Sequence, residues 1–156
     1  MQQPAVIHST FVIERSFSVT PERVFAAFAD PAKKRRWIAE NRGVTVEDFQ
    51  MDFRPGGRET ARYRFLGEPF PGKAFSNATV YQDIVPNRLI VIAYTMALEG
   101  RVFSSSQATF ELLASDTGTD LVFTEQGAYF EGADGPKMRE DGWRLLIGKL
   151  AKEVES

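Results

Sequence analysis

The 156-residue sequence contains no cysteine and only one histidine, His8. The lack of cysteine excludes disulfides, thiolate nucleophiles, iron–sulfur clusters and cysteine-ligated zinc. A single histidine cannot form a histidine-rich metal site, and no obvious Ser–His–Asp triad is present. His8 stands near the chain end, so we expect an exposed side chain rather than an acid–base group. We therefore expect no metal and no other cofactor.

Strong charge of one sign and long hydrophobic runs are also missing. Nineteen Lys and Arg residues oppose twenty-one Asp and Glu residues, which gives a net charge of −2 and no general affinity for nucleic acid. No stretch approaches the roughly 18 apolar residues that a membrane helix needs. The first ten residues, MQQPAVIHST, lack the basic start and apolar run of a signal peptide. The sequence thus predicts a cytoplasmic protein that binds neither nucleic acid nor a membrane.

Aromatic residues are abundant, with thirteen Phe, four Tyr and two Trp. The apolar fraction of 43% and the charged fraction of 26% are typical of a globular protein, and the length predicts one domain over residues 1–156. Bulky aromatic side chains can line an apolar pocket or simply fill a core. Composition leaves both alternatives open.

The N-terminal third of the chain predicts one strand and two short helices. Apolar and polar residues alternate over residues 8–19, which indicates a strand with one buried face. A helix should follow, because Thr20-Pro21 supplies a cap and a first helical residue. Asp30-Pro31 should end it, since a residue before proline avoids the α conformation. Residues 32–39 then predict a second short helix.

The rest of the chain predicts a meander of strands and a long helix. Alternation and turn residues indicate six strands, at 44–53, 58–66, 73–85, 89–98, 101–113 and 119–129. Residues 137–155 carry an apolar stripe at helical spacing, and the sheet is the only surface on which it can pack. Basic and acidic residues should fill the other, solvent-facing side of this helix. Because strands twist, a sheet of about seven strands curls, and a helix across it leaves space between the two. The predicted class is α+β, with a curled antiparallel sheet and a C-terminal helix that encloses a cavity.

Several short motifs occur in an order that resembles a known superfamily. They are residues 17–25 (FSVTPERVF), Asp30-Pro31 with Trp37, residues 52–57 (DFRPGG), Tyr81 with residues 83–89 (DIVPNRL), Gly118-Thr119, residues 124–127 (TEQG) and Gly142-Trp143. Together they resemble the START-like (SRPBCC) superfamily with its helix-grip, Bet v 1-like fold. The nearest likeness is the branch named after the activator of heat-shock-protein-90 ATPase, which includes many stand-alone bacterial proteins and polyketide cyclase-like relatives.

This resemblance implies a hydrophobic cavity between the sheet and the long helix. We therefore expect the chain to bind a small hydrophobic molecule, as a carrier or sensor. The superfamily spans several functions, so two alternatives stay open. One is a cyclase-, dehydratase- or hydrolase-type enzyme acting on an aromatic or lipid-like substrate. The other is a co-chaperone-like interaction module with a link to the stress response, although a co-chaperone of that kind needs a second domain.

Glu125 is the candidate catalytic residue. Counting by two along the last strand places Glu125 on its more aromatic face, beside Phe123 and Tyr129, which we expect to point inward. A buried carboxylate is costly unless it is paired, hydrated or protonated. Glu125 is therefore either a structural ion-pair or hydrogen-bond partner, or a ligand anchor or general base.

Further side chains are candidates for the cavity wall. Ser104 and Ser106 share a face with bulky residues, and small residues there would leave volume. Tyr81, which shares a face with Asp83, could offer a hydroxyl group. We expect Trp37 near the opening. The full set of expected ligand-binding residues is Trp37, Tyr63, Tyr81, Tyr94, Ser104, Ser106, Phe110, Phe123, Glu125 and Trp143.

Other features are expected outside the cavity. Arg58, Arg62 and Arg64 should form a basic outer face, either solvated or open to a protein partner with acidic groups. The KKRR run at residues 33–36 predicts a solvated helix end. The turn at 54–57 should take positive φ at both glycines, and an Asp52–Arg54 pair should brace it. The unpaired edge strands of an open sheet can pair with a second copy, so a homodimer is an open alternative.

Overall fold

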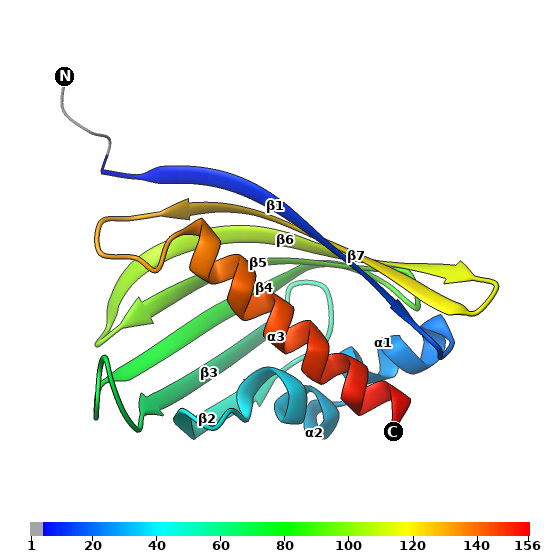
Figure 1. The fold of residues 1–156 in the computed structure, drawn as a ribbon, viewed down its shortest axis with the longest axis horizontal. Coiled ribbons are helices and arrows are strands. Elements are labelled where there is room, and N and C mark those ends of the chain that lie inside the picture. Colours follow the sequence, from blue (N-terminus) through cyan, green and yellow to red (C-terminus); the bar gives the residue numbers. More distant parts are fainter. Residues whose placement is uncertain (1–4) are drawn as a thin grey trace.

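A seven-stranded antiparallel sheet in the order β1-β7-β6-β5-β4-β3-β2 curls around the C-terminal helix (Figure 1). It is seen in a computed structural model that describes residues 5–156. Residues 1–4, part of the stretch searched for a targeting signal, lie outside the described residues. The strands are β1 (Ile7–Phe17), β2 (Val44–Met51), β3 (Arg58–Phe65), β4 (Ala74–Val85), β5 (Leu89–Leu98), β6 (Arg101–Ser115) and β7 (Gly118–Tyr129). The helices are α1 (Pro21–Ala29), α2 (Pro31–Lys34), the π-helical turn η1 (Arg35–Ala39) and α3 (Pro136–Glu155).

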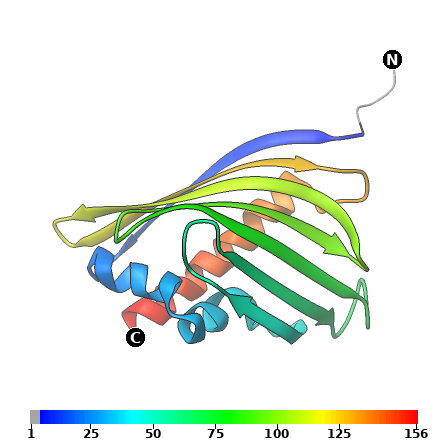
Figure 2. The ribbon, with the colours of Figure 1, turned by 180° about the vertical axis from the view of Figure 1, so that it is seen from behind.

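The predicted α+β helix-grip fold is confirmed, with strand and helix bounds close to those expected. Every pairing but one joins strands that are consecutive in the chain, and β1 returns to pair with β7. From behind, the sheet covers α3, while α1, α2 and η1 lie at one end (Figure 2). None of the helices within residues 5–156 is both long and apolar enough to cross a bilayer.

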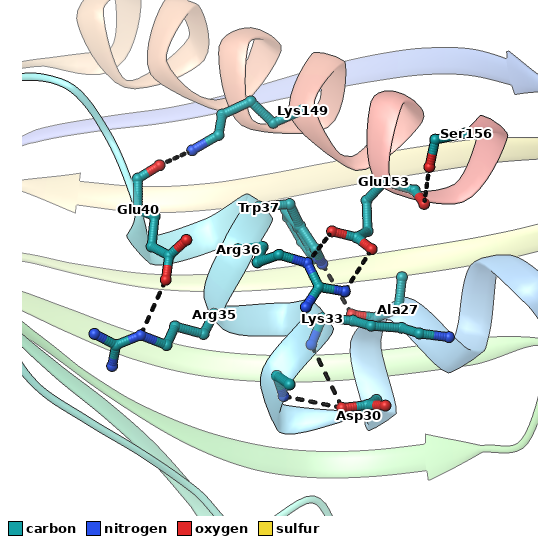
Figure 3. Close-up of polar contacts among 11 residues, drawn as sticks. Ala27, Asp30, Lys33, Arg35, Arg36, Trp37, Glu40, Lys149, Glu153 and Ser156 are labelled. Carbon is teal, nitrogen blue, oxygen red and sulfur yellow. Dashed lines mark hydrogen bonds and ion pairs between the residues drawn. The ribbon is translucent and has the colours of Figure 1, made fainter.

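Two side chains define the starts of the short helices. The Thr20 hydroxyl oxygen accepts a hydrogen bond from the backbone N–H of Arg23 at 3.3 Å, so Thr20 caps α1 as predicted. Asp30 ends α1 and caps α2, where its carboxylate accepts from the backbone N–H of Ala32 at 2.9 Å. The chain then runs without a break into η1. The indole N–H of Trp37, on η1, donates to the backbone oxygen of Ala27 at 2.9 Å and so ties η1 to α1 (Figure 3).

Polar contacts hold η1 against the second half of α3 (Figure 3). The Arg36 guanidinium donates two hydrogen bonds of 2.8 Å to the Glu153 carboxylate. Lys149 donates to the backbone oxygen of Glu40 and, at 3.0 Å, to the side-chain oxygen of Asn41. These contacts fix the wall that η1 forms beside the helix.

A β-bulge overturns the predicted facing of Asp83. The register between β4 and β5 shifts between Tyr81 and Asp83, so Asp83 is exposed while Tyr81 is buried. Ile84 takes the inward direction and packs against the core. Alternation alone cannot reveal an inserted residue, because the bulge changes the period locally.

The turn before β3 needs glycine for two different reasons. Gly56 has a φ of +82°, as predicted, but Gly57 has no positive φ. At Gly57 an added Cβ would lie 2.1 Å from the backbone oxygen of Asp52. The expected Asp52–Arg54 pair is present at 2.8 Å, with both side chains exposed.

We predict that Gly57→Ala destabilises the protein by more than about 1 kcal/mol, because backbone must move to admit the methyl group. Gly43→Ala is the matched control, since an added Cβ there meets nothing within 4 Å and its φ is not positive. Urea unfolding of both variants measures the difference. Equal stability of the two variants would contradict the close approach at Gly57.

Candidate functional site

A cavity of about 270 Å³ lies between α3, η1 and strands β3 to β5. Its walls are mostly apolar. The apolar lining comprises Ile38, Val44, Tyr63, Phe75, Ile92, Met96, Phe110, Met138, Trp143 and Leu146. Met138 and Asn41 are exposed to solvent and mark the mouth. The cavity has the aromatic and aliphatic wall of a small-molecule site.

One row of cross-strand neighbours runs beneath this helix. Its members are Glu59 on β3, Thr79 on β4, Tyr94 on β5, Ser106 on β6 and Gly127 on β7. Directly opposite residues project from the same face of a sheet, so the row forms the floor under α3. Glu59, Thr79 and Tyr94 line the cavity, whereas Ser106 and Gly127 lie outside its wall.

The expectation that the small residues of β6 leave open volume is wrong. An added Cβ on Gly127 would lie 3.0 Å from both Ser106 Oγ and the ring of Tyr129. Ser104 is fully buried and accepts a 2.8 Å hydrogen bond from Arg139. The small side chains therefore make room for neighbouring protein groups. The Ser106 hydroxyl is buried without a hydrogen-bond partner among residues 5–156.

Glu125 is fully buried, as the strand pattern predicts. Its carboxylate accepts hydrogen bonds from the hydroxyl of Tyr94, from the Tyr129 hydroxyl at 3.0 Å and from the Trp143 indole at 3.1 Å. Burial raises the pKa of Glu125, and these hydrogen bonds and the positive charge of Arg139 offset only part of the effect. Burial and the nearby Glu125 charge also raise the pKa of Tyr94, so Tyr94 keeps its proton.

Arg139 joins this network from α3, against the expectation that charged residues of this helix face solvent. Its guanidinium donates to the Asp134 carboxylate at 2.8 and 2.9 Å. It also donates to the Tyr94 hydroxyl oxygen at 3.1 Å and to Ser104. Arg139 stands four residues before Trp143, so helical spacing places both on the inner face. That spacing was the signal that sequence reasoning missed.

A second buried polar cluster lies at the other end of the cavity. Of the four basic residues 33–36, Lys34 alone is buried, which corrects the prediction of a solvated run. Its ammonium lies 2.8 Å from Glu59, and the Tyr81 hydroxyl donates to the same carboxylate oxygen at 2.5 Å. The rings of Phe28 and Trp37 lie 5.5 and 5.4 Å from the ammonium. An aromatic enclosure of this kind stabilises a desolvated cation.

The structure divides the expected site residues into two groups. Four line the cavity: Tyr63, Tyr94, Phe110 and Trp143. Six lie outside its wall and are buried, namely Trp37, Tyr81, Ser104, Ser106, Phe123 and Glu125. Trp37 thus packs in the core rather than near an opening. Ligand contact by any of the ten stays a prediction.

Sequence reasoning missed most of the polar lining, which includes Lys34, Glu59, Asn77, Thr79 and Asp134. Alternation places Glu59 beside Tyr63 on one face of β3, which was the available signal. No group of three or more Asp, Glu or His side chains within residues 5–156 is arranged to hold a metal ion.

The outer arginines are partly neutralised. Arg62 and Arg64 both lie against Glu47, at 3.1 and 2.8 Å, and Arg58 is exposed. Use of this face by a partner stays a prediction.

We predict that Glu125→Gln makes stability less dependent on pH. A raised pKa in the folded state favours the protonated carboxyl, so the wild type loses stability as the pH rises from about 4.5 through the folded pKa. Each unit of elevation corresponds to about 1.4 kcal/mol. The melting temperature of the variant relative to wild type should therefore be higher at pH 8 than at pH 5.

Glu111→Gln, an exposed change on β6, is the control and should shift melting equally at both values. If Glu125→Gln loses the same stability at pH 5 and pH 8, the negative charge itself is needed for the network.

Comparison with known proteins identifies the family. The sequence model described as Activator of Hsp90 ATPase homolog 1-like protein matches residues 18–155. The solved structure of Mll3558 from Rhizobium loti is similar, with 44% identity, a TM-score of 0.85, and coverage of 97% of this chain and 100% of that chain. A putative uncharacterized protein from Rhizobium leguminosarum is 34% identical, with a TM-score of 0.88 and 96% of each chain covered.

More distant relatives show the fold alone. An AHSA1-like protein from Aeromonas hydrophila is 17% identical, with a TM-score of 0.68 over 94% of this chain and 92% of that chain. A comparison with curated proteins finds no match. Because the family match spans nearly the whole chain, the protein belongs to the Activator of Hsp90 ATPase homolog 1-like family, a branch of the START-like superfamily.

Proposed function

We propose that this protein binds a small, mostly apolar molecule in the cavity beneath α3, as a carrier or sensor. The observation that carries the proposal is the cavity of about 270 Å³ itself, with aromatic walls and a mouth at Met138 and Asn41. Its few polar groups could orient a ligand that the apolar walls hold.

Gly142 supports this reading. It lies on the cavity side of α3, and a Cβ added there would meet nothing within 4 Å. Protein interiors are ordinarily close-packed, and leaving a cavity in a core costs stability. Glycine in a helix costs a further 0.5–1 kcal/mol or so relative to alanine. Both features cost stability, so they fit a space that holds a ligand better than they fit a packed core.

A second candidate function is an acid–base enzyme, favoured by the Glu125–Tyr94 contact. Glu125 does not reach the cavity, but Tyr94 lines it and donates its hydroxyl proton to Glu125. Proton transfer to a bound substrate would therefore pass through Tyr94, with Glu125 behind it. The raised pKa of Glu125 suits such a role. In this case Tyr94→Phe should abolish turnover of a bound substrate while binding remains.

The proposed function is tested by closing the cavity from α3. We predict that Gly142→Leu abolishes binding of N-phenyl-1-naphthylamine, an apolar fluorescent probe, because the new side chain enters the cavity. Stability should be unchanged or rise by up to roughly 1 kcal/mol, since leucine favours the helix. Native mass spectrometry of gently purified wild type, followed by denaturing extraction, should in addition reveal a co-purified apolar molecule that the variant lacks.

Gly148→Leu is the matched control on the same helix. Gly148 lies outside the cavity wall, and its added Cβ would come only within 3.8 Å of Arg15. This variant should bind the probe as the wild type does. Undiminished binding by Gly142→Leu would place the site elsewhere, and no probe binding by wild type would refute an apolar site.

A further inference from the structure

The polar groups around the cavity form two clusters that differ in how far their hydrogen-bonding capacity is used. The Arg139 cluster consists of Arg139, Tyr94, Trp143 and Glu125, whose polar groups are engaged mainly with one another. The Tyr94 oxygen accepts from Arg139 and from Trp143, each at 3.1 Å, and its hydroxyl proton is donated to Glu125. A phenolic group has one proton and two lone pairs, so Tyr94 is fully used. This end of the cavity offers a ligand little that is not already engaged.

The cluster at Lys34 is open. Its ammonium has three N–H groups and makes one hydrogen bond within residues 5–156, to Glu59. The Thr79 hydroxyl and the Asn77 amide also line the cavity, and neither side chain forms a hydrogen bond to another of these residues. Thr79 is nevertheless buried. Within residues 5–156 neither group is among the side-chain atoms that are buried without a partner, so both remain reachable from the cavity. Water or a ligand in the cavity can therefore complete their hydrogen bonds.

The sheet register brings these groups to one place. Thr79 is the direct cross-strand partner of Glu59, and Asn77 pairs with Ala61, two residues further along β3. Thr79 and Asn77 therefore stand side by side on the inner face of β4. Lys34 lies on α2, so it contacts Glu59 from the helical side of the cavity. The donors of helix and sheet thus line the same cavity, on either side of Glu59.

The charges of this cluster select the kind of oxygen that it can bind. Lys34 is balanced by Glu59 at 2.8 Å, with both side chains buried. An anionic ligand would add a negative charge beside Glu59 without a free cation to match it. A neutral carbonyl oxygen would use the N–H and O–H donors at no such cost. A purely apolar ligand would leave those donors unpaired.

We propose that the Lys34, Thr79 and Asn77 cluster binds a neutral carbonyl oxygen, so that the ligand class is apolar ketones, esters, amides or quinones. The proposal rests on the proposed function, because it assigns the polar contact of the same cavity. In this assignment Lys34 and Thr79 determine ligand specificity. The Lys34 ammonium and the Thr79 hydroxyl each donate a hydrogen bond to the carbonyl oxygen of the ligand.

A pair of matched probes tests it. The first is 2-dimethylamino-6-propionylnaphthalene, a fluorescent ketone. The second is 2-dimethylamino-6-propylnaphthalene, which has the same ring and chain length but no carbonyl oxygen. We expect wild type to bind the ketone roughly tenfold more tightly, as one hydrogen bond to a charged donor provides. Fluorescence titration gives both dissociation constants.

Two variants separate the contact from general packing. Thr79→Val keeps the side-chain shape and should weaken ketone binding severalfold, with the alkyl probe unchanged. Lys34→Met combined with Glu59→Gln removes both charges together, avoids an unpaired buried carboxylate, and leaves an amide oxygen for Tyr81. It should abolish the preference for the ketone. Lys137→Met, an exposed change on α3, should alter neither constant.

The outcomes distinguish the two proposals. If both probes bind wild type equally, or if the variants weaken both alike, the carbonyl assignment is overturned while the cavity stands as a binding site. If neither probe binds, the proposed function itself fails. A ketone preference that is reduced by Thr79→Val, lost in the double variant and kept in Lys137→Met supports the assignment.

Discussion

The buried carboxylate of Glu125 is the constraint around which the rest of the molecule is arranged. It lies under the long helix with no exposure to water, and so it needs donors from both the sheet and α3. Tyr94 and Tyr129 supply them from the strands, and Trp143 supplies one from the helix. The same contacts fix how α3 crosses the sheet. The first half of the helix is thus held by buried polar groups. The second half is held by apolar packing of Ile147, Leu150 and Val154, with polar contacts to η1 at the surface.

The difference between the two halves of α3 explains where the cavity lies. Hydrogen bonds from Arg139 and Trp143 to Tyr94 hold the first half of the helix above β5. The second half packs directly onto the hydrophobic core. The wall at η1 is kept in place by the Arg36–Glu153 pair. The cavity therefore lies beside the first half, with the saturated Arg139 cluster at one end and the open Lys34 cluster at the other. The cavity is therefore asymmetric, with apolar walls between two polar ends of different hydrogen-bonding capacity.

Sequence reasoning predicted the elements well because alternation, caps and turn residues act locally. The strands and helices begin and end within a few residues of the expected bounds, and the inward direction of Glu125 followed from counting by two. It failed where tertiary partners decide. Lys34 and Arg139 were assigned to solvent by residue type, but each is buried against a carboxylate contributed by a segment distant in the chain or by a loop. Asp83 changed face because of a bulge. Small residues at 104 and 106 do not reveal whether space or a neighbouring ring lies above them.

The return of β1 to β7 has a consequence for how the chain folds. All other strand pairings join consecutive segments, so they close short loops, whereas β1 and β7 close a loop of about a hundred residues. The entropy cost of closing that loop is therefore offset by the β1–β7 pairing alone. α1 follows β1 directly, and α3 packs against both β1 and η1. The surface on which α3 packs is therefore complete only once β1 has paired with β7. Closure of the cavity under α3 thus waits for the strand pairing that is most distant in sequence.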